Sequence, residues 1–280
     1  MADAQPVIVT VAPTGPLTTR EQHPGVPLTP AEIGVAVAES AEAGAAVAHI
    51  HARDEQGVPT ADPDVYREII REIEARSDIV IQASTGVGFT ANCDQRLAII
   101  TEGDLPVPMA TLNPASMTFG QAVFDNPPSF VDALAQAMLD RGIQPEMEVY
   151  DVGHVGICLD LVRRGLVAPP LRFSFVMGVR GGMPGDPALL PTLIRMLPDD
   201  AIWQAIGIGR AQLPLTFAAI ALGGNVRVGL EDNVYWSRGQ LADSNAQLVA
   251  RAVELVRLSG RPVATPADVR AQLADAVPTG

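Results

Sequence analysis

The chain has 280 residues, of which 48% are hydrophobic and 18% charged, and its net charge is -13. This composition predicts a folded protein with a large core rather than a disordered one, and the acidic charge argues against a nucleic-acid surface, which needs a basic stripe. All 19 basic residues are arginine, so the sequence excludes a Schiff-base lysine, a pyridoxal phosphate anchor, a carbamylated-lysine metal bridge and a Walker-type phosphate lysine.

Two cysteines, Cys93 and Cys158, are too few for a disulfide framework and are typical of reduced thiols, so we expect a cytoplasmic protein. The first residues lack a basic segment followed by an apolar one, so no secretory signal is expected. The longest apolar run, residues 215–222, is too short to span a bilayer.

Short apolar segments typical of strands alternate along the chain with amphipathic segments typical of helices. Thr29 and Pro30 predict the start of the first helix, as its N-cap and first-turn proline, and Gly44 predicts its end. We expect strands at residues 7–12, 46–53, 79–83, 109–112, 147–151, 172–177, 202–206 and 226–230. We expect helices at residues 30–44, 63–76, 93–102, 128–141, 157–164, 188–197, 213–222 and 246–258, and one more within 264–277.

Eight repeated strand-helix units, with strands that are mostly apolar throughout, predict an α/β fold of parallel strands covered by helices. The closed form is a (β/α)8 TIM barrel. An open doubly wound sheet is the alternative, but no Gly-x-Gly-x-x-Gly motif follows the first strand. We therefore expect residues 1–280 to form a single barrel domain with an extra C-terminal helix.

The second predicted strand carries two histidines, His49 and His51. Side chains alternate across a strand, so both imidazoles lie on the same face. A lone histidine in such a strand is more often a core residue satisfied by a hydrogen bond. The pair, with apolar or small neighbours, instead favours a metal site.

The end of the eighth predicted strand carries Arg227, Glu231 and Asp232. In a closed barrel the eighth and second strands flank the first, about 10 Å apart, so inward His and Glu side chains can converge. Two histidines and a carboxylate leave positions open for substrate, as in a catalytic zinc site or an Fe(II) facial triad. Without the histidines, a solvated loop or a helix cap would be the better reading of the two acids.

Seven motifs carry a resemblance to a known family. They are PLTP at residues 27–30, HIHARD at 49–54, STG at 84–86, MATLN at 109–113, PEMEV at 145–149, GIGR at 207–210 and VRVGLEDN at 226–233. Over nearly its whole length the sequence resembles the β-keto acid cleavage enzymes. The resemblance implies a zinc-dependent TIM barrel that converts a β-keto acid and acetyl-CoA into acetoacetate and a new acyl-CoA, and it suggests a homotetramer.

The resemblance also implies roles for the strand-end residues. Zinc, held by His49, His51 and Glu231, would act as Lewis acid on the keto group and stabilise the enolate. Asp232 would take the proton from C2, and Arg227 would hold the substrate carboxylate or a developing oxyanion.

Three further residues are expected near the reacting groups. Ser84 and Thr111 match family positions that make polar contacts there. Glu148 would tune Asp232 or Ser84, although Glu146 could take that role, and a strand-end ion pair is an equal alternative for Glu148.

The substrates impose two more expectations. Leu17 stands where members of the family that handle an amino-substituted keto acid have an acidic residue, so we predict a neutral, aliphatic β-keto acid. Without lysine, the CoA phosphates need arginine, and Arg210, Arg180 and Arg238 follow the seventh, sixth and eighth strands at the correct end of the barrel. A surface salt bridge is the alternative for each of them.

Two other functions fit parts of the pattern. A metal-dependent hydrolase of the amidohydrolase type also uses a His-x-His strand, but it places that pair on the first strand and usually needs further histidines or a carbamylated lysine. The other alternative function is that of a barrel that keeps the metal but serves only in binding or assembly. The presence of Arg227, Glu231 and Asp232 argues against it.

Overall fold

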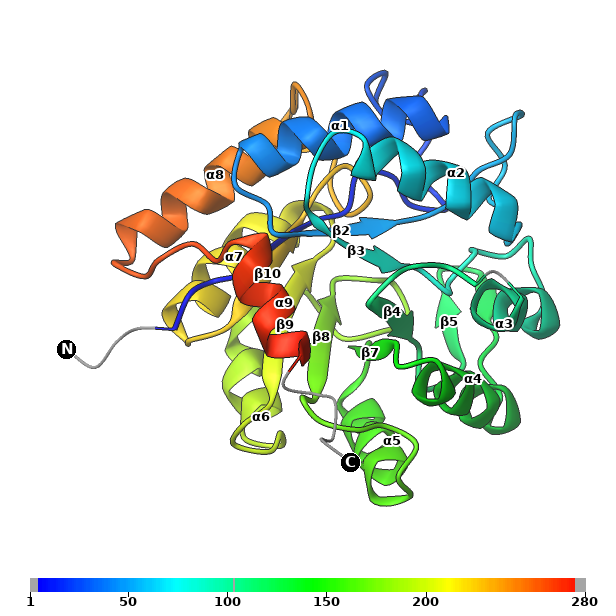
Figure 1. Cartoon of the computed structure of the whole chain (residues 1–280). Helices are drawn as coiled ribbons and strands as arrows, with labels where there is room; N and C mark the ends of the chain where they lie inside the picture. Colours follow the sequence, from blue (N-terminus) through cyan, green and yellow to red (C-terminus); the bar gives the residue numbers. More distant parts are fainter. Residues whose placement is uncertain (1–4, 103, 275–280) are drawn as a thin grey trace.

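The computed structural model describes residues 5–102 and 104–274. Eight parallel strands close into a barrel with helices around it (Figure 1). The strands are β1 (Val9–Val11), β2 (Val47–Ile50), β3 (Val80–Ala83), β4 (Met109–Leu112), β7 (Gln144–Val149), β8 (Arg172–Met177), β9 (Ile202–Gly207) and β10 (Asn225–Val228). The predicted (β/α)8 barrel is therefore confirmed, and the open sheet is excluded because β1 pairs with both β2 and β10.

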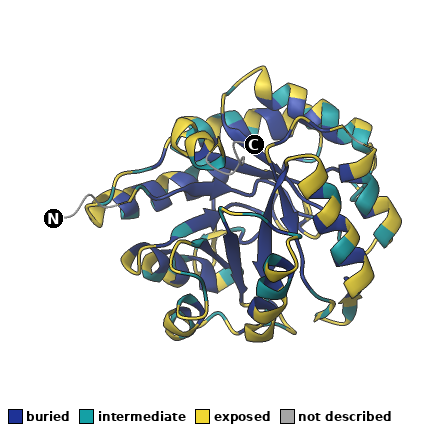
Figure 2. Cartoon of the chain, turned by 60° about the horizontal axis from the view of Figure 1, so that its bottom comes forward, coloured by how far each residue is buried: buried dark blue, intermediate teal, exposed yellow. Residues whose placement is uncertain are grey.

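The helices turn one side to the barrel and the other to solvent, as the burial colours of Figure 2 show. The alternation of buried strands and half-exposed helices is what the apolar strands predicted. The helices are α1 (Pro30–Glu42), α2 (Pro63–Glu74), α3 (Cys93–Thr101), α4 (Pro128–Asp140), α5 (Val152–Arg163), α6 (Leu190–Ile194), α7 (Gln212–Ala221), α8 (Asn245–Leu258) and α9 (Pro266–Ala274), with 3₁₀ turns η1 (Pro187–Leu189) and η2 (Gly209–Ala211).

Helix α1 starts where the sequence predicted. The Thr29 hydroxyl accepts a hydrogen bond from the Glu32 N–H, and the Glu32 carboxylate accepts one from the Thr29 N–H, which together form a capping box. Against the opposing effect of burial, hydrogen bonds from the Thr29 and Leu28 N–H groups to the carboxylate, followed by that of Arg20, hold the pKa of Glu32 at about 2.

Helix α5 begins five residues earlier than expected. Asp151 caps it by accepting a hydrogen bond from the Gly153 N–H, and the glycines of the first turn obscure this start in the sequence. His154 therefore lies in a helix rather than a loop, and its Nδ1 accepts a hydrogen bond from the Tyr150 N–H. The helix expected at residues 188–197 is shorter than predicted and consists of η1 and α6.

Two short hairpins were not predicted. The first, β5 (Met117–Phe119) and β6 (Ala122–Phe124), follows β4, and the second, β11 (Tyr235–Ser237) and β12 (Gln240–Leu241), follows β10. Both therefore extend from the carboxyl ends of barrel strands, the end at which TIM barrels carry their sites.

Strand β1 forms the seam of the barrel, with β2 on one side and β10 on the other. Thr10 lies in register with both Val47 and Arg227. Gly229 follows β10 with φ of 143°, and a Cβ there would lie 2.1 Å from the Ala12 carbonyl oxygen, so only glycine allows this close approach. The chain can then turn and present Glu231 and Asp232 above the seam.

The extra C-terminal helix is α9, and it lies at the opposite end of the barrel. Val269 packs with Ile8, Val47, Val80 and Met109, which stand at or next to the first residues of four strands. The Arg172 guanidinium, inside the barrel, donates a 2.9 Å hydrogen bond to Gln272. Residues 275–277 of the predicted helix lie outside the described residues.

Candidate active site

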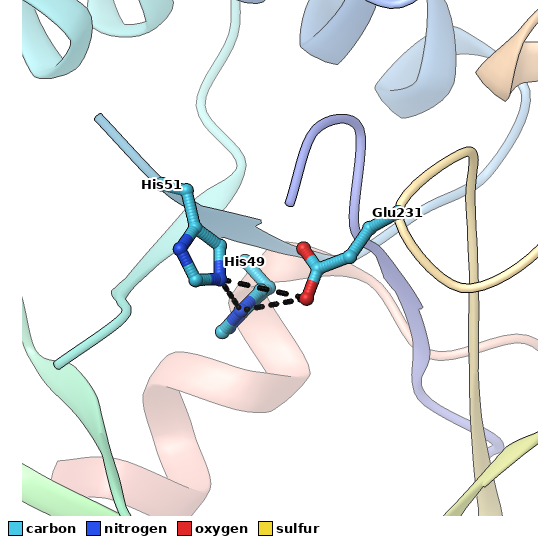
Figure 3. Close-up of side chains that lie close together, drawn as sticks. All are labelled: His49, His51 and Glu231. Atoms are coloured by element: carbon cyan, nitrogen blue, oxygen red, sulfur yellow. Dashed lines mark hydrogen bonds and ion pairs between the residues drawn. The ribbon is translucent and has the colours of Figure 1, made fainter. Parts of the chain in front are cut away.

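His49, His51 and Glu231 converge at the carboxyl end of the barrel (Figure 3). The two Nε2 atoms are 3.1 Å apart, and the Glu231 Oε1 lies 3.6 Å from His49 Nε2 and 3.5 Å from His51 Nε2. The histidines are 1% and 4% exposed. A Cβ on Gly15 would lie 2.4 Å from Glu231 Cγ, so the absence of a side chain there gives Glu231 its space.

The chemistry of these three side chains fits a divalent cation. His49 Nδ1 donates a 2.8 Å hydrogen bond to the amide oxygen of Gln82 on β3, which leaves Nε2 free as a metal ligand. Burial lowers the pKa of His51 and so favours the neutral imidazole that a metal needs. Glu231 Oε2 is buried without a hydrogen-bond partner among the described residues.

Arg227, 3% exposed, lies at the centre of three carboxylates. Its Nε and Nη2 donate to the two oxygens of Asp232 at 2.9 and 2.8 Å, Nη2 donates to Glu231 at 2.5 Å, and Nη1 donates to Glu148 at 3.3 Å. Its donors therefore face protein carboxylates, whereas the sequence predicted that it would hold a substrate carboxylate or an oxyanion.

The three acids respond differently to this environment. Burial raises the pKa of Asp232 to about 6, against the opposing charge of Arg227, and burial also raises the pKa of Glu148. Burial works in the same direction on Glu231, but Arg227 and the two histidines outweigh it and hold the pKa of Glu231 well below its usual range. The charge of Arg227 thus acts to lower the pKa of all three acids.

Glu148 and Glu146 both point into the barrel from β7, at different depths. Glu148 contacts Arg227, whereas Glu146 accepts 2.6 Å hydrogen bonds from Ser174 and Gln204 deeper in the barrel. Of the two glutamates that the sequence left open, Glu148 is therefore the one beside Asp232 and the histidines.

Ser84 and Thr111 have different surroundings. Ser84 lines the central pocket described below, and its hydroxyl accepts a 3.2 Å hydrogen bond from the Gly86 N–H. The Thr111 hydroxyl accepts one from the Thr85 N–H at 3.1 Å, and Thr111 is not among the described residues that line the pocket. Asn113, two residues further along, lines it instead, and sequence reasoning missed it although it ends the MATLN motif.

The central pocket is a cavity of about 230 Å³ with a polar end and an apolar end. The polar end is formed by the candidate metal ligands His49, His51 and Glu231, here called the metal-ligand set, together with Glu148, Arg227 and Asp232. Phe89, Phe119 and Tyr150 stack edge to face with ring centroids 6.2 and 6.1 Å apart. The other apolar residues are Pro16, Leu17, Phe124, Val176, Val179 and Ile208.

Leu17 lies at the rim of this pocket and is 47% exposed. Its loop is fixed on both sides: the Arg53 guanidinium donates to the carbonyl oxygens of Gly15 and Thr18, and the Thr18 hydroxyl donates to the carbonyl oxygen of Glu231. Leu17, the residue from which the sequence predicted an uncharged substrate, is thus held close to the metal-ligand set.

The three arginines expected to bind CoA are all exposed. Arg210, in η2, lines a second hollow of about 580 Å³ that shares Val179 and Ile208 with the central pocket. Arg180 precedes Gly181 after β8, and Arg238 lies in the turn of the β11–β12 hairpin. Of the three, Arg210 is the one whose hollow shares wall residues with the central pocket.

Comparison with known proteins gives consistent results. Residues 6–274 match the beta-keto acid cleavage enzyme family. The chain is 36% identical over 266 residues to 3-keto-5-aminohexanoate cleavage enzyme of Acetoanaerobium sticklandii, covering 94% of this chain and 96% of the relative. It is 38% identical over 274 residues to 3-oxoadipate:acetyl-CoA acetyltransferase of Cupriavidus necator, covering 96% and 95%.

Among solved structures, the ternary complex of ObcA with C4-CoA adduct and oxalate superimposes with a TM-score of 0.79 at 23% identity. The match covers 90% of this chain and 68% of that one. At this identity the likeness supports the fold alone.

Proposed function

Because this chain belongs to the beta-keto acid cleavage enzyme family, we propose that it converts a neutral β-keto acid and acetyl-CoA into acetoacetate and a new acyl-CoA. The observation that carries the proposal is the convergence of His49, His51 and Glu231 beside Asp232 at one end of a pocket whose other end is apolar. The chain is an enzyme, a β-keto acid:acetyl-CoA acyltransferase.

Zinc is the cation that we propose for the His49, His51 and Glu231 site. Two neutral imidazoles and one carboxylate, with room left for substrate, suit a catalytic zinc ion. The Gln82 hydrogen bond to His49 supports this role because it orients the ring. Bound there, zinc would supply Lewis-acid polarisation of the substrate keto group.

Asp232 is the base in this proposal. It lines the pocket, and Arg227 holds both of its oxygens, so its position is fixed. It takes a proton from C2 of the β-keto acid, between the keto group and the carboxylate, where the resulting carbanion is delocalised as an enolate.

The acyl exchange then proceeds in two carbon-centred steps. C2 attacks the acetyl carbonyl carbon, a C–C bond forms, and the C–S bond breaks to release CoA thiolate. The thiolate attacks the original keto carbon, and the bond from that carbon to C2 breaks. C2 recovers the proton from Asp232, which gives acetoacetate and a new acyl-CoA, so atoms and electrons balance.

Arg227 and Glu148 position these groups. The three carboxylates around Arg227 support the assignment that it holds Asp232 and Glu231 in place. Glu148, on β7, contacts Arg227 from across the pocket and helps to fix the position of its guanidinium. Ser84, whose hydroxyl lines the pocket, makes a polar contact with a reacting oxygen.

The side chain of the substrate is uncharged in this proposal. Leu17 and the aromatic stack of Phe89, Phe119 and Tyr150 offer no carboxylate to an ammonium group and no cation to a second carboxylate. A buried charge without a partner is costly, so the apolar end favours a hydrocarbon chain.

Acetoacetate formation with acetyl-CoA and a panel of neutral, cationic and anionic β-keto acids tests this function. We expect acetoacetate only when acetyl-CoA is present, and the highest kcat/KM with a neutral substrate. Because burying even a neutral polar group without a partner costs about 1–3 kcal/mol, and a charge costs more, the charged substrates should be at least tenfold poorer.

Leu17→Glu is the informative variant for the panel, and Leu17→Met, of similar volume, is its control. The glutamate should raise kcat/KM for a cationic substrate and lower it for the neutral one, whereas the methionine should leave the order unchanged. Absence of acetoacetate from every mixture, with metal bound, would contradict the acyl transfer itself and favour metal-dependent hydrolysis.

Arg210 is the residue that we propose for the phosphates of CoA. Its hollow adjoins the central pocket, and arginine pairs well with phosphate. Arg210→Ala should raise KM for acetyl-CoA by about tenfold, the effect of losing one charged hydrogen bond, with kcat and the KM for the keto acid nearly unchanged. Steady-state kinetics with each substrate varied in turn measures this.

Arg180→Ala and Arg238→Ala provide the comparison because both arginines are exposed near the same end of the barrel. If either variant raises the KM for acetyl-CoA more than Arg210→Ala does, that arginine rather than Arg210 binds the CoA phosphates. Arg257→Ala, on α8, changes the net charge by the same amount and serves as the distant control.

The homotetramer and the cytoplasmic location stay predictions. Exposed apolar residues on the outer helices, such as Phe217 on α7 and Leu258 at the end of α8, give an assembly surface to bury. Within residues 5–102 and 104–274, no helix has the length and apolar character needed to cross a membrane.

A further inference from the structure

Arg53 is a buried cation, and among the described residues no carboxylate accepts a hydrogen bond from it. It follows β2 and is 6% exposed. Its Nε and Nη2 donate to the carbonyl oxygen of Gly15, Nη2 also donates to that of Thr18 at 2.7 Å, and Nη1 donates to that of Gly57 at 2.9 Å. Burying a charge is costly, so these contacts call for an explanation beyond an ordinary surface salt bridge.

Two of these carbonyl oxygens belong to the loop that follows β1, residues 12–18, here called the rim loop. This loop holds the main chain of Glu231 on both sides. The Glu231 N–H donates to the carbonyl oxygen of Ala12, and the Glu231 carbonyl oxygen accepts a hydrogen bond from the Thr18 hydroxyl, each at 3.1 Å. A Cβ on Gly15 would lie 2.9 Å from the carboxylate carbon of Glu231, so the loop backbone packs directly against that side chain. The position of the rim loop therefore sets the position of the Glu231 carboxylate.

On the basis of the metal site and the substrate proposed above, we propose that Arg53 is a positioning residue that fixes the rim loop, and through it both the metal ligand Glu231 and the rim residue Leu17. Leu17 lies in the sequence between Gly15 and Thr18, whose carbonyl oxygens the guanidinium binds. The same hydrogen bonds thus hold the Leu17 side chain at the pocket. One guanidinium group couples the metal affinity of the site to its choice of substrate.

Arg53 suits this role because its own side of the contact is also held. Its hydrogen bond to Gly57 lies within the loop after β2, where the Asp54 carboxylate accepts two further hydrogen bonds from main-chain N–H groups. A planar guanidinium carries its donors in fixed directions, so it can bind two loops at once. Burial lowers the pKa of Arg53 and the negative charge of Glu231 opposes that effect, so attraction between the two side chains adds to the hydrogen bonds.

Arg53→Met and Arg53→Lys test the assignment through metal binding, measured without substrate. In competition with a chromogenic chelator, both variants should bind zinc about 10–100-fold more weakly than the wild type, the usual effect of losing a group that orients a metal ligand. Lysine keeps the charge but lacks the planar fork, so it should not restore the affinity. Arg20→Met removes an exposed arginine between β1 and α1 that pairs with Glu32, and this matched control should bind zinc as the wild type does.

Substrate preference at saturating zinc is the second measurement. Release of the rim loop should raise the KM for the neutral β-keto acid more than it lowers kcat, because Asp232 is unchanged and Arg227 still holds it. The ratio of kcat/KM between neutral and cationic substrates should fall toward one, because Leu17 loses its fixed place. A merely structural defect would reduce the amount of active enzyme and leave this ratio unchanged.

Thr18→Val keeps the test decisive if the Arg53 variants do not fold, which circular dichroism of the metal-free proteins establishes. Valine has the shape of threonine but lacks the hydroxyl that donates to the carbonyl oxygen of Glu231. This variant should bind zinc about fivefold more weakly, the equivalent of one neutral hydrogen bond.

The remaining outcomes separate this role from the proposed function. Wild-type zinc affinity in folded Arg53→Met, or in Thr18→Val if the Arg53 variants do not fold, would overturn the assignment. Full recovery of the affinity in Arg53→Lys would assign the effect to charge alone and would overturn positioning by the fork. If the wild type binds zinc but makes no acetoacetate from any β-keto acid, the proposed function fails, and the zinc affinities still decide the role of Arg53.

Discussion

Asp232→Asn is expected to lower kcat by about 10²–10⁴-fold, the contribution of a positioned general base. The asparagine amide has the shape of the carboxylate, and its oxygen can still accept a hydrogen bond from Arg227. It cannot take a proton from C2, so the reaction stops before the carbanion forms. His49, His51 and Glu231 are unchanged, and the bound metal should remain.

Two quantities measured on the same preparation check this expectation: kcat for acetoacetate formation and the metal content per chain. The exchange of the C2 hydrogens of the β-keto acid with D2O, followed by NMR without acetyl-CoA, should fall together with kcat. Asp78→Asn is the matched control. Asp78 is exposed and its carboxylate lies 3.7 Å from Arg270, so this substitution should change neither quantity. Loss of metal from Asp232→Asn would mean that Asp232 belongs to the ligand set.

Arg227→Met should destabilise the fold by about 3–5 kcal/mol, because removing one partner of a buried ion pair leaves the other charge uncompensated. Here three carboxylates lose their common cation at once. Methionine fills similar volume, so cavity formation contributes little. Urea unfolding of the metal-free protein at pH 7 measures the loss without interference from a bound ion.

Arg96 provides a matched comparison, since it is equally buried but donates no hydrogen bond to a carboxylate. It donates to the carbonyl oxygens of Thr85 and Asp125 and to the Asn126 amide, and its guanidinium lies 4.6 Å from the ring centroids of Phe124 and Phe130. Arg96→Met should therefore cost hydrogen bonds and ring contacts, and this cost should be nearly constant between pH 5 and pH 8.

The two variants should differ in their pH dependence. Burial already raises the pKa of Asp232 and Glu148, and loss of Arg227 raises both further above their unfolded values. A group with a raised folded pKa stabilises the fold fully below its unfolded pKa, and that stability is lost as the pH rises through the folded pKa. The deficit of Arg227→Met should thus grow from pH 5 to pH 8; a constant deficit would contradict the proposed role of Arg227 in neutralising the acids.

Strand alternation and barrel closure could be predicted from the sequence with good accuracy. The apolar strands specified parallel pairing, and the neighbours of β1 brought His49 and His51 close to Glu231. These inferences depend only on the two-residue period of a strand and on the order of strands in a closed barrel. Both are independent of how side chains pack.

The depth of a side chain in the barrel was harder to predict. Glu146 and Glu148 share a face, as do Thr111 and Asn113, and alternation cannot say which of two such residues reaches the pocket. Packing decides which residue does so. Ser174 and Gln204 donate hydrogen bonds that hold Glu146 deeper in the barrel, and the Thr85 N–H donates a hydrogen bond to the Thr111 hydroxyl. The family resemblance favoured Thr111, whereas Asn113 is the residue that lines the pocket.

Short elements were the other gap. The β5–β6 hairpin has two strands of three residues joined by a two-residue turn at Gly120 and Gln121, too brief for a clear alternation. Yet it carries Phe119 and Phe124 to the pocket. A glycine, Gly120, between two short segments with apolar residues was the available signal.

The seam at β1 also has a consequence for the order of folding. Its two sides come from opposite ends of the chain: the Ile8 N–H donates a 2.8 Å hydrogen bond to the side-chain oxygen of Asn225, 217 residues away. Contacts between such distant segments form late because loop closure opposes them. His49 and His51 lie on one side of this seam and Glu231 and Asp232 on the other, so a ribosome-bound chain that has reached β9 holds the imidazoles without either acid. A metal ion that needs all three ligands would therefore bind only after the barrel has closed, and we expect that it does not act as the nucleus of folding.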